Sequence, residues 1–176
     1  RLANLPANSL DIATAGLRGK WNANLLDMDC YETNQKGETG FRFNSRLSYT
    51  DSLISYMYLP PEPVLGFEQW HINPDNYITY RFGRSISADF RLTSGNKKFM
   101  VVSTSDNGVQ FSLSGIDIGA SLKALPFAPP VDGVLAAEVT LSPSKVHFNT
   151  QGKLSVDSLG YDHVPIGDVD LSLSHL

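Results

Sequence analysis

The feature of this sequence that most constrains its fold is an alternation of apolar and polar residues with a period of two, strongest in the second half. Between residues 85 and 93, Ile86, Ala88, Phe90 and Leu92 alternate with polar residues. Successive side chains of a β-strand point to opposite faces, so this spacing puts the four apolar side chains on one face. The segment therefore predicts a strand with an apolar face and a polar face.

The same pattern recurs at intervals of about ten residues, the spacing of an all-β array. Turn signals separate the segments: Gly95-Asn96, Asp106-Asn107-Gly108, Asp132-Gly133, Pro143-Ser144 and Gln151-Gly152. The Asn-Gly pair predicts a hairpin with a type I′ turn, because these residues accept positive φ. No stretch has sustained helical periodicity, so we expect an all-β chain made mainly of antiparallel meanders.

The first 82 residues are less regular. Residues 17–25 predict a strand, residues 41–49 a second and residues 77–82 a third. Residues 51–58 suit either a short helix or a further strand, ended by the prolines that follow. We expect residues 1–82 to be a less regular part of the same sheet or an insertion, and residues 83–176 to be a repetitive antiparallel sheet.

Composition limits the function. Charged residues make up 18% of the chain and the net charge is −4. Phosphate binding needs clustered Lys and Arg, so we expect no nucleic-acid partner. Cys30 is the only cysteine, which excludes an intramolecular disulfide. The chain begins on Arg1 and ends within an alternating pattern, and we expect it to be a segment of a longer extracytoplasmic protein.

Catalytic or metal chemistry has little support in the sequence. His71, His147, His163 and His175 are far apart and form no ligand pair. The serines lie in no nucleophile motif, and no phosphate-binding loop is present. We therefore expect no enzymatic activity, no catalytic residues, no metal site and no cofactor.

An acidic cluster near the end of the chain leaves two interpretations open. Asp168 and Asp170 would share one face of a strand, where Asp157 and Asp162 lie near them in sequence. Carboxylates suit Ca²⁺, but no loop of oxygen ligands around a glycine is present. A polar outer face of the sheet is the alternative, and the one that strand alternation favours.

Aromatic residues also allow two interpretations. Trp21, Trp70, Tyr77 and Tyr80 would form a sugar-stacking platform or part of the core. The apolar strand face must likewise be buried against something. A second sheet would make a β-sandwich, whereas a curled sheet would leave a trough in which acyl chains replace the missing core. Periodicity does not separate the two.

The second half of the chain resembles the TamB family, part of the AsmA-like group of envelope proteins. The likeness runs through residues 129–141, 152–161 and 164–173, which follow the recurring unit G-x-L-x-V-x-x-L-x-Y … P-x-G-D-x-x-L-x-L. Residues 89–92 and 111–119 have the same style. Overall composition is similar to the long versions found in Bacteroides-type bacteria.

This resemblance implies a parent protein that is anchored in the inner membrane and spans the periplasm. Its body would be a long β-sheet curled into a trough with an apolar interior, which conducts phospholipid towards the outer membrane or supports outer-membrane protein assembly. Some members of the family partner an outer-membrane barrel of the Omp85 type. The residues that the resemblance assigns to the lining are Ile86, Ala88, Phe90, Leu92, Val109, Phe111, Leu113, Leu135, Ala137, Val139, Leu141, Val146, Phe148, Leu154, Val156, Val169, Leu171 and Leu173.

Two other functions stand beside this one. A β-sandwich binding module would recognise a glycan or a surface protein through Trp70 and the nearby tyrosines. A β-rich hydrolase is the more distant alternative, because carboxylate pairs form in space and leave no sequence motif.

Overall fold

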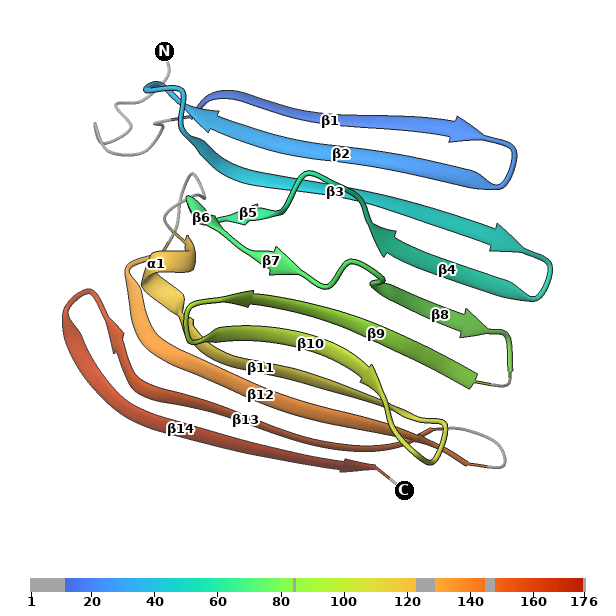
Figure 1. Cartoon of the computed structure of the whole chain (residues 1–176). Coiled ribbons are helices and arrows are strands. Elements are labelled where there is room, and N and C mark those ends of the chain that lie inside the picture. The colour runs from blue at the N-terminus through green and yellow to red at the C-terminus, as the bar shows by residue number, and fades with distance from the viewer. Residues whose placement is uncertain (1–11, 84, 123–128, 145–147, 176) are drawn as a thin grey trace, which may run out of the picture.

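A computed structural model describes residues 12–83, 85–122, 129–144 and 148–175. The described strands form one antiparallel sheet of 14 strands, and the sheet is not closed (Figure 1). The elements are β1 (Ile12–Asn22), β2 (Leu25–Asn34), β3 (Thr39–Thr50), β4 (Leu53–Tyr58), β5 (Val64–Leu65), β6 (Glu68–Gln69), β7 (His71–Ile72), β8 (Tyr77–Arg81), β9 (Ser85–Ser94), β10 (Lys97–Ser103), β11 (Val109–Asp117), α1 (Ile118–Leu122), β12 (Val131–Pro143), β13 (Phe148–Tyr161) and β14 (Val164–His175).

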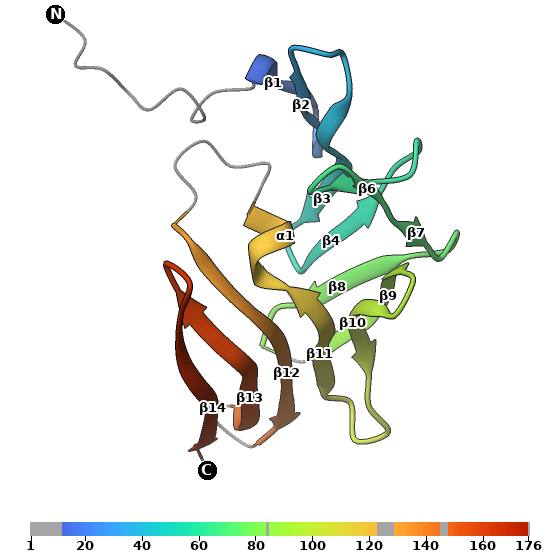
Figure 2. The same cartoon turned by 90° about the vertical axis from the view of Figure 1, so that its left-hand side faces the viewer.

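The topology is a meander in which long strands pair with their sequence neighbours. The order is β1-β2-β3-β4-β8-β9-β10-β11-β12-β13-β14. Seen from the end, the sheet curls, and α1 lies on its concave side (Figure 2). The expected all-β curled sheet is therefore confirmed. The sandwich alternative is not, since every described strand belongs to the same sheet.

Turns follow the sequence signals in part. Gly95 has positive φ between β9 and β10, as expected. The Asp106-Asn107-Gly108 turn is not type I′, because only Asn107 has positive φ and the loop closes with the Thr104 N–H donating to the Gly108 carbonyl. The predicted turns at Asp132-Gly133 and Gln151-Gly152 are wrong, and both pairs lie within strands.

The turn that does join β13 to β14 carried no expected signal. Tyr161 pairs with Val164, leaving Asp162 and His163 as a two-residue loop with φ of 49° and 64°. Positive φ at both positions is the geometry of a type I′ turn. Residues 53–58, for which a helix and a strand were both open, form strand β4.

Strand register keeps the apolar residues of the alternating segments on one face from β9 to β12. Phe90 lies opposite Val101, Val101 opposite Phe111, and Phe111 opposite Val139. Directly opposed residues in an antiparallel pair point to the same face. A β-bulge interrupts the pairing of β11 with β12 between Leu113 and Ile116, where Gly115 has φ of 69°. Because of this bulge, Ile116 points to the same face as Leu113.

Residues 59–76, called the excursion 59–76 below, leave the meander between β4 and β8 and occupy the space between β3 and β9. There β5 pairs with β3, and β7 pairs with β9. The side chains of two asparagines hold the excursion in place, because they bond backbone groups that have no strand partner there. The Asn76 side chain bonds both the N–H and the carbonyl of Tyr58, and the Asn73 side chain bonds the Asp89 carbonyl and the Arg91 N–H.

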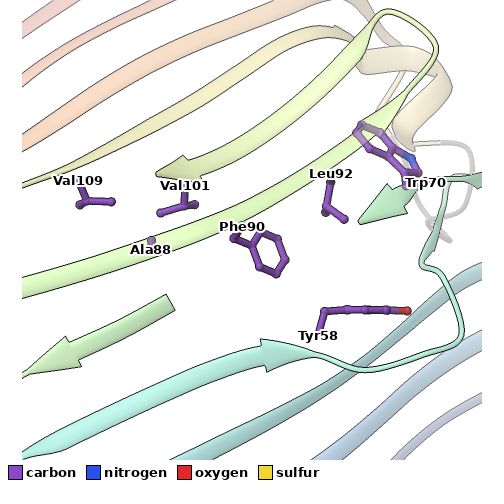
Figure 3. Close-up of a cluster of buried hydrophobic side chains, with 7 residues drawn as sticks. All are labelled: Tyr58, Trp70, Ala88, Phe90, Leu92, Val101 and Val109. Carbon is purple, nitrogen blue, oxygen red and sulfur yellow. The ribbon is translucent and has the colours of Figure 1, made fainter. Parts of the chain in front are cut away.

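The core is centred on the concave face around β9. Its buried members are Tyr58, Trp70, Ala88, Phe90, Leu92, Val101 and Val109. In Figure 3 they form a row from Val109 to Trp70, except for Tyr58, which lies to one side of it. Aromatic rings extend the row across the strands, with centroids 5.9 Å apart for Tyr56 and Phe90 and 5.3 Å apart for Phe99 and Phe111.

Helix α1 is a single turn whose start is fixed by Asp117. The Asp117 carboxylate accepts a hydrogen bond of 2.7 Å from the Ala120 N–H, as an N-cap residue does. Among the described residues, no helix is long and apolar enough to cross a membrane.

Candidate functional site

The concave face differs in exposure from one region to the next. Among the predicted lining residues, Ala88, Phe90, Leu92, Val109 and Val156 are buried. Those that are half-buried are Ile86, Leu113, Leu135, Ala137, Val139, Leu141, Phe148, Leu154 and Val169. Phe111, Leu171 and Leu173 are exposed, and Val146 lies outside the described residues. The face is therefore covered in the middle of the sheet and open at β14.

The first half of the chain adds residues to this face that the predicted lining left out. Leu47 lies opposite Tyr56, and Tyr56 lies opposite Ile78, which itself faces Ala88. The apolar face thus runs without interruption from β9 back to β3. Alternation at residues 41–49 contained this information, but only strand pairing shows which of the two faces continues the row.

The opposite, convex face carries charged side chains, with apolar ones such as Met100 and Val102 between them. Arg46 and Asp27 form a two-bonded ion pair there, and Arg91 bonds Asp89. Both pairs are partly exposed, so each contributes little to stability. They nevertheless make the two faces chemically distinct, which fits a sheet that is solvated on its outside.

A pocket of about 350 Å³ opens on the concave face beneath α1. Its floor is the sheet, with Phe43, Phe90, Leu92, Phe99 and Leu113. Its walls are the excursion 59–76 and the helix; the lining residues there are Leu65, Gly66, Glu68, Trp70, Ala120 and Ser121. The volume lies within the range of about 300–1,000 Å³ typical of small-molecule sites.

Gly66 allows the excursion and α1 to approach each other. Its φ is 65°, and a Cβ built there would lie 3.3 Å from the Ala120 carbonyl oxygen. An L side chain at this position would be strained and would press on the helix. Gly66 therefore allows the two segments that form the pocket wall to lie close together.

Trp70 borders the pocket, but the polar atom of its side chain is not exposed to it and has no partner among the described residues. Trp70 is 5% exposed, and its indole Nε1 is buried without a hydrogen-bond acceptor. Indole N–H is a donor only, and leaving a buried donor unsatisfied costs about 1–3 kcal/mol.

Glu68 and Lys97 lie at the polar side of the pocket as an ion pair. The Ser94 hydroxyl donates a 2.7 Å hydrogen bond to the other carboxylate oxygen of Glu68. Burial raises the pKa of Glu68, but the bonds from Lys97 and Ser94 outweigh it and hold the pKa below its ordinary value. The carboxylate is therefore ionised at neutral pH and compensates the lysine.

The predicted aromatic platform is not assembled. Tyr77 lies opposite Asp89 and Tyr80 opposite Ile86, so the two tyrosines point to opposite faces. Trp70 is buried in the core, while Trp21 lies far along the sheet on β1, where its ring is 5.8 Å from that of Tyr49. The four aromatic residues therefore do not share a surface.

The acidic cluster lies on the polar side of β13 and β14. Asp170 faces Ser155, and the Asp168 carboxylate accepts a hydrogen bond of 2.8 Å from the Ser158 N–H. Within the described ranges, no three or more His, Cys, Asp and Glu side chains are grouped to hold a metal ion. His71 bonds Glu62 at 2.9 Å, and His147 lies outside the described residues.

Glu32 is a carboxylate on the concave face that sequence reasoning did not single out. It lies opposite Phe41 and is buried. Burial raises the pKa of its carboxyl above the ordinary value. Its position in an alternating stretch was visible, but its burial depends on neighbours that are distant in sequence.

Comparison of the chain with models of protein families, with curated proteins and with solved structures finds no match.

Proposed function

We propose that this chain is a non-enzymatic, lipid-contacting segment of a TamB-like protein. In this proposal the concave face conducts phospholipid across the periplasm towards the outer membrane, or supports the assembly of outer-membrane proteins. The parent protein is anchored in the inner membrane and engages an outer-membrane barrel of the Omp85 type.

The observation that carries the proposal is the continuity of the apolar face. Opposed residues join Leu47 on β3 to Ala88 on β9. Leu92, which shares a strand face with Ala88, is joined to Leu171 on β14 through Phe99, Leu113, Ala137 and Leu154. No second sheet covers this apolar face in the part of the chain that the structure describes. An acyl chain laid on this face would contribute about 0.8 kcal/mol per buried methylene.

The polarity of the two faces supports a lipid ligand over a soluble polar one. The Arg46–Asp27 and Arg91–Asp89 pairs lie on the convex face. The concave face carries mainly aromatic and aliphatic side chains, besides Glu32 and the Glu68–Lys97 pair. A bound chain would thus be shielded from water by the sheet itself. Titratable groups at the pocket, Glu68 and Lys97, neutralise each other, and this pairing fits a binding role better than acid–base catalysis.

The test is to purify the chain, extract it with organic solvent and identify the extracted molecules by mass spectrometry. Phospholipid or other acyl lipid is expected. A fluorescent acyl-chain probe should bind the protein, and Val139→Asp should weaken that binding because it puts a charge on the open apolar face.

Thr140→Asp is the matched control, since Thr140 is the next residue along β12 and points to the other face. It should leave probe binding unchanged, and circular dichroism should show that both variants retain the sheet. Absence of extracted lipid together with absence of probe binding would overturn the proposal.

A further inference from the structure

We propose that one rim of the sheet, where strands β1, β3 and β8 end, docks the protein on the surface of a phospholipid bilayer. The docking residues are Trp21, Tyr49 and Phe82, called the aromatic rim below, with the cations Lys20 and Arg81 beside them. The inference goes beyond the proposed function, because it concerns a whole bilayer surface and not an acyl chain held on the concave face.

The meander brings the three aromatic residues to one end of the sheet. Successive strands are antiparallel in the order β1-β2-β3-β4-β8, so β1, β3 and β8 run in the same direction and end at the same rim (Figure 1). Trp21 is the last residue but one of β1, Tyr49 has the same position in β3, and Phe82 directly follows β8. Each of these strands therefore places one aromatic ring where the chain turns.

The three rings are connected through their neighbours. The ring centroids of Trp21 and Tyr49 are 5.8 Å apart. Tyr49 lies opposite Ile54, and Ile54 lies opposite Tyr80. The ring centroid of Tyr80 is in turn 5.6 Å from that of Phe82. The aromatic rim is therefore a continuous surface and not three isolated side chains.

The aromatic rim is open to solvent, unlike the core of the concave face. The exposed fraction is 59% for Trp21 and 44% for both Tyr49 and Phe82, whereas it is 2% for Phe90. Large apolar side chains that are gathered in one exposed place mark an interaction surface. The side chains of the rim are therefore available to a partner without any rearrangement of the sheet.

The residue types at the rim suit a bilayer interface. Trp and Tyr are enriched at the headgroup level of membranes, where the ring enters the apolar region and its polar atom stays in contact with water. Lys20 and Arg81 are exposed next to these rings. Because each directly precedes Trp21 or Phe82 in the chain, both cations are placed to meet lipid phosphates while the rings enter the bilayer.

The charges of the described residues at this end of the strands also fit an anionic lipid surface. Lys20 lies opposite Asp27, but that carboxylate is bonded twice by Arg46. Asp51, in the turn between β3 and β4, adds a second carboxylate. The three cations, Lys20, Arg46 and Arg81, outnumber these two carboxylates. The rim is therefore positive, whereas the whole chain has a net charge of −4.

The test is flotation of the purified chain with vesicles made of equal parts of phosphatidylglycerol and phosphatidylcholine. The native protein should float with the vesicles, and its tryptophan fluorescence should shift to shorter wavelength as the Trp21 ring leaves water. The variant Trp21→Phe leaves only the signal of the buried Trp70, which should not shift. Added salt should weaken binding, because it screens the attraction of Lys20 and Arg81 to lipid phosphates.

The double variant Trp21→Ser, Phe82→Ser should bind these vesicles roughly tenfold more weakly or worse, because two apolar rings no longer enter the bilayer. Both side chains are exposed, so the variant should keep the sheet, which circular dichroism checks. Tyr77→Ser is the matched control, since it removes an exposed aromatic ring from the other end and the other face of β8. It should bind like the native protein. Lys20→Gln with Arg81→Gln should weaken binding to these vesicles but not to pure phosphatidylcholine.

Equal vesicle binding by the native protein and the double variant would overturn the inference, and so would a native protein that does not float. Self-association that the double variant loses, without vesicle binding, would overturn it in favour of a second copy of the chain. These results leave the proposed function standing as long as the acyl-chain probe binds. A protein that floats with vesicles yet yields no extracted lipid and binds no probe would instead overturn the proposed function and support this inference.

Discussion

The middle of the sheet and its β14 end share one sequence pattern but differ in surroundings. Phe90 and Leu171 both occupy the apolar positions of an alternating strand, yet Phe90 is 2% exposed and Leu171 is 60% exposed. Residues of the excursion 59–76 and of α1 line one pocket with Phe90, Leu92 and Phe99 in the middle of the sheet, whereas β13 and β14 have no such cover among the described elements. Alternation therefore determines which face is apolar, and the segments that leave the meander determine how much of it is buried.

The largest expected effect comes from truncating the same kind of position in the two regions. Phe90→Ala should lower the free energy of unfolding by about 3–5 kcal/mol, because it leaves a cavity in a packed core. Leu171→Ala should change the free energy by less than about 1 kcal/mol, because the side chain is mostly in water already. Urea unfolding followed by circular dichroism measures both, and equal losses would contradict the difference in packing.

An intermediate effect is expected from loosening the cover without touching the apolar face. Asn76→Ala removes the side chain that replaces a strand partner for Tyr58, and leaves buried backbone groups unsatisfied. The cost should be about 1–3 kcal/mol. Binding of an environment-sensitive apolar dye should rise as the middle of the face opens. A stable variant with unchanged dye binding would show that the excursion is held by other contacts.

The smallest effect on stability is expected at Glu32. This residue places a buried carboxyl group on the β2 part of the concave face, unlike the middle of the sheet and its β14 end. Its pKa is raised by burial, so the folded state favours the neutral acid. The stability associated with protonation is present below the ordinary pKa and is lost as pH rises through the folded-state pKa. Glu32→Gln should therefore stabilise the protein at pH 8 and lose this advantage near pH 4. Thermal unfolding at the two pH values measures the difference, and an effect that grows towards acid pH would contradict it.

Sequence predicted the local part of this structure well. Alternation predicted a strand over residues 85–93, which the structure has as β9 (Ser85–Ser94), and the face that Ile86 to Leu92 share, because a period of two is a property of each strand alone. It failed at Gln151-Gly152, where turn residues lie inside β13 and the partner strand on each side overrides their preference.

The candidate pocket was beyond prediction from sequence, since its parts come from segments far apart in the chain. Trp70 was weighed as a platform or a core residue, and nothing local indicated that it would line a cavity with Leu113 and Ala120. The ion pair of Glu68 with Lys97 joins β6 to β10 through the same long-range arrangement. Such contacts depend on how the excursion folds back into the sheet, which a single strand pattern does not contain.

The open meander has a consequence for how such a molecule changes in size. After two antiparallel strands the chain again runs in its original direction, and its apolar side chains again point to the same face of the sheet. A hairpin is therefore the smallest unit that can be added without disturbing either. Duplication or deletion of one hairpin, such as β13–β14 with its two-residue turn, would lengthen or shorten the apolar surface while leaving the remaining pairings intact. The length of the sheet can therefore vary in steps of one hairpin, and natural variants should differ by roughly one hairpin at a time.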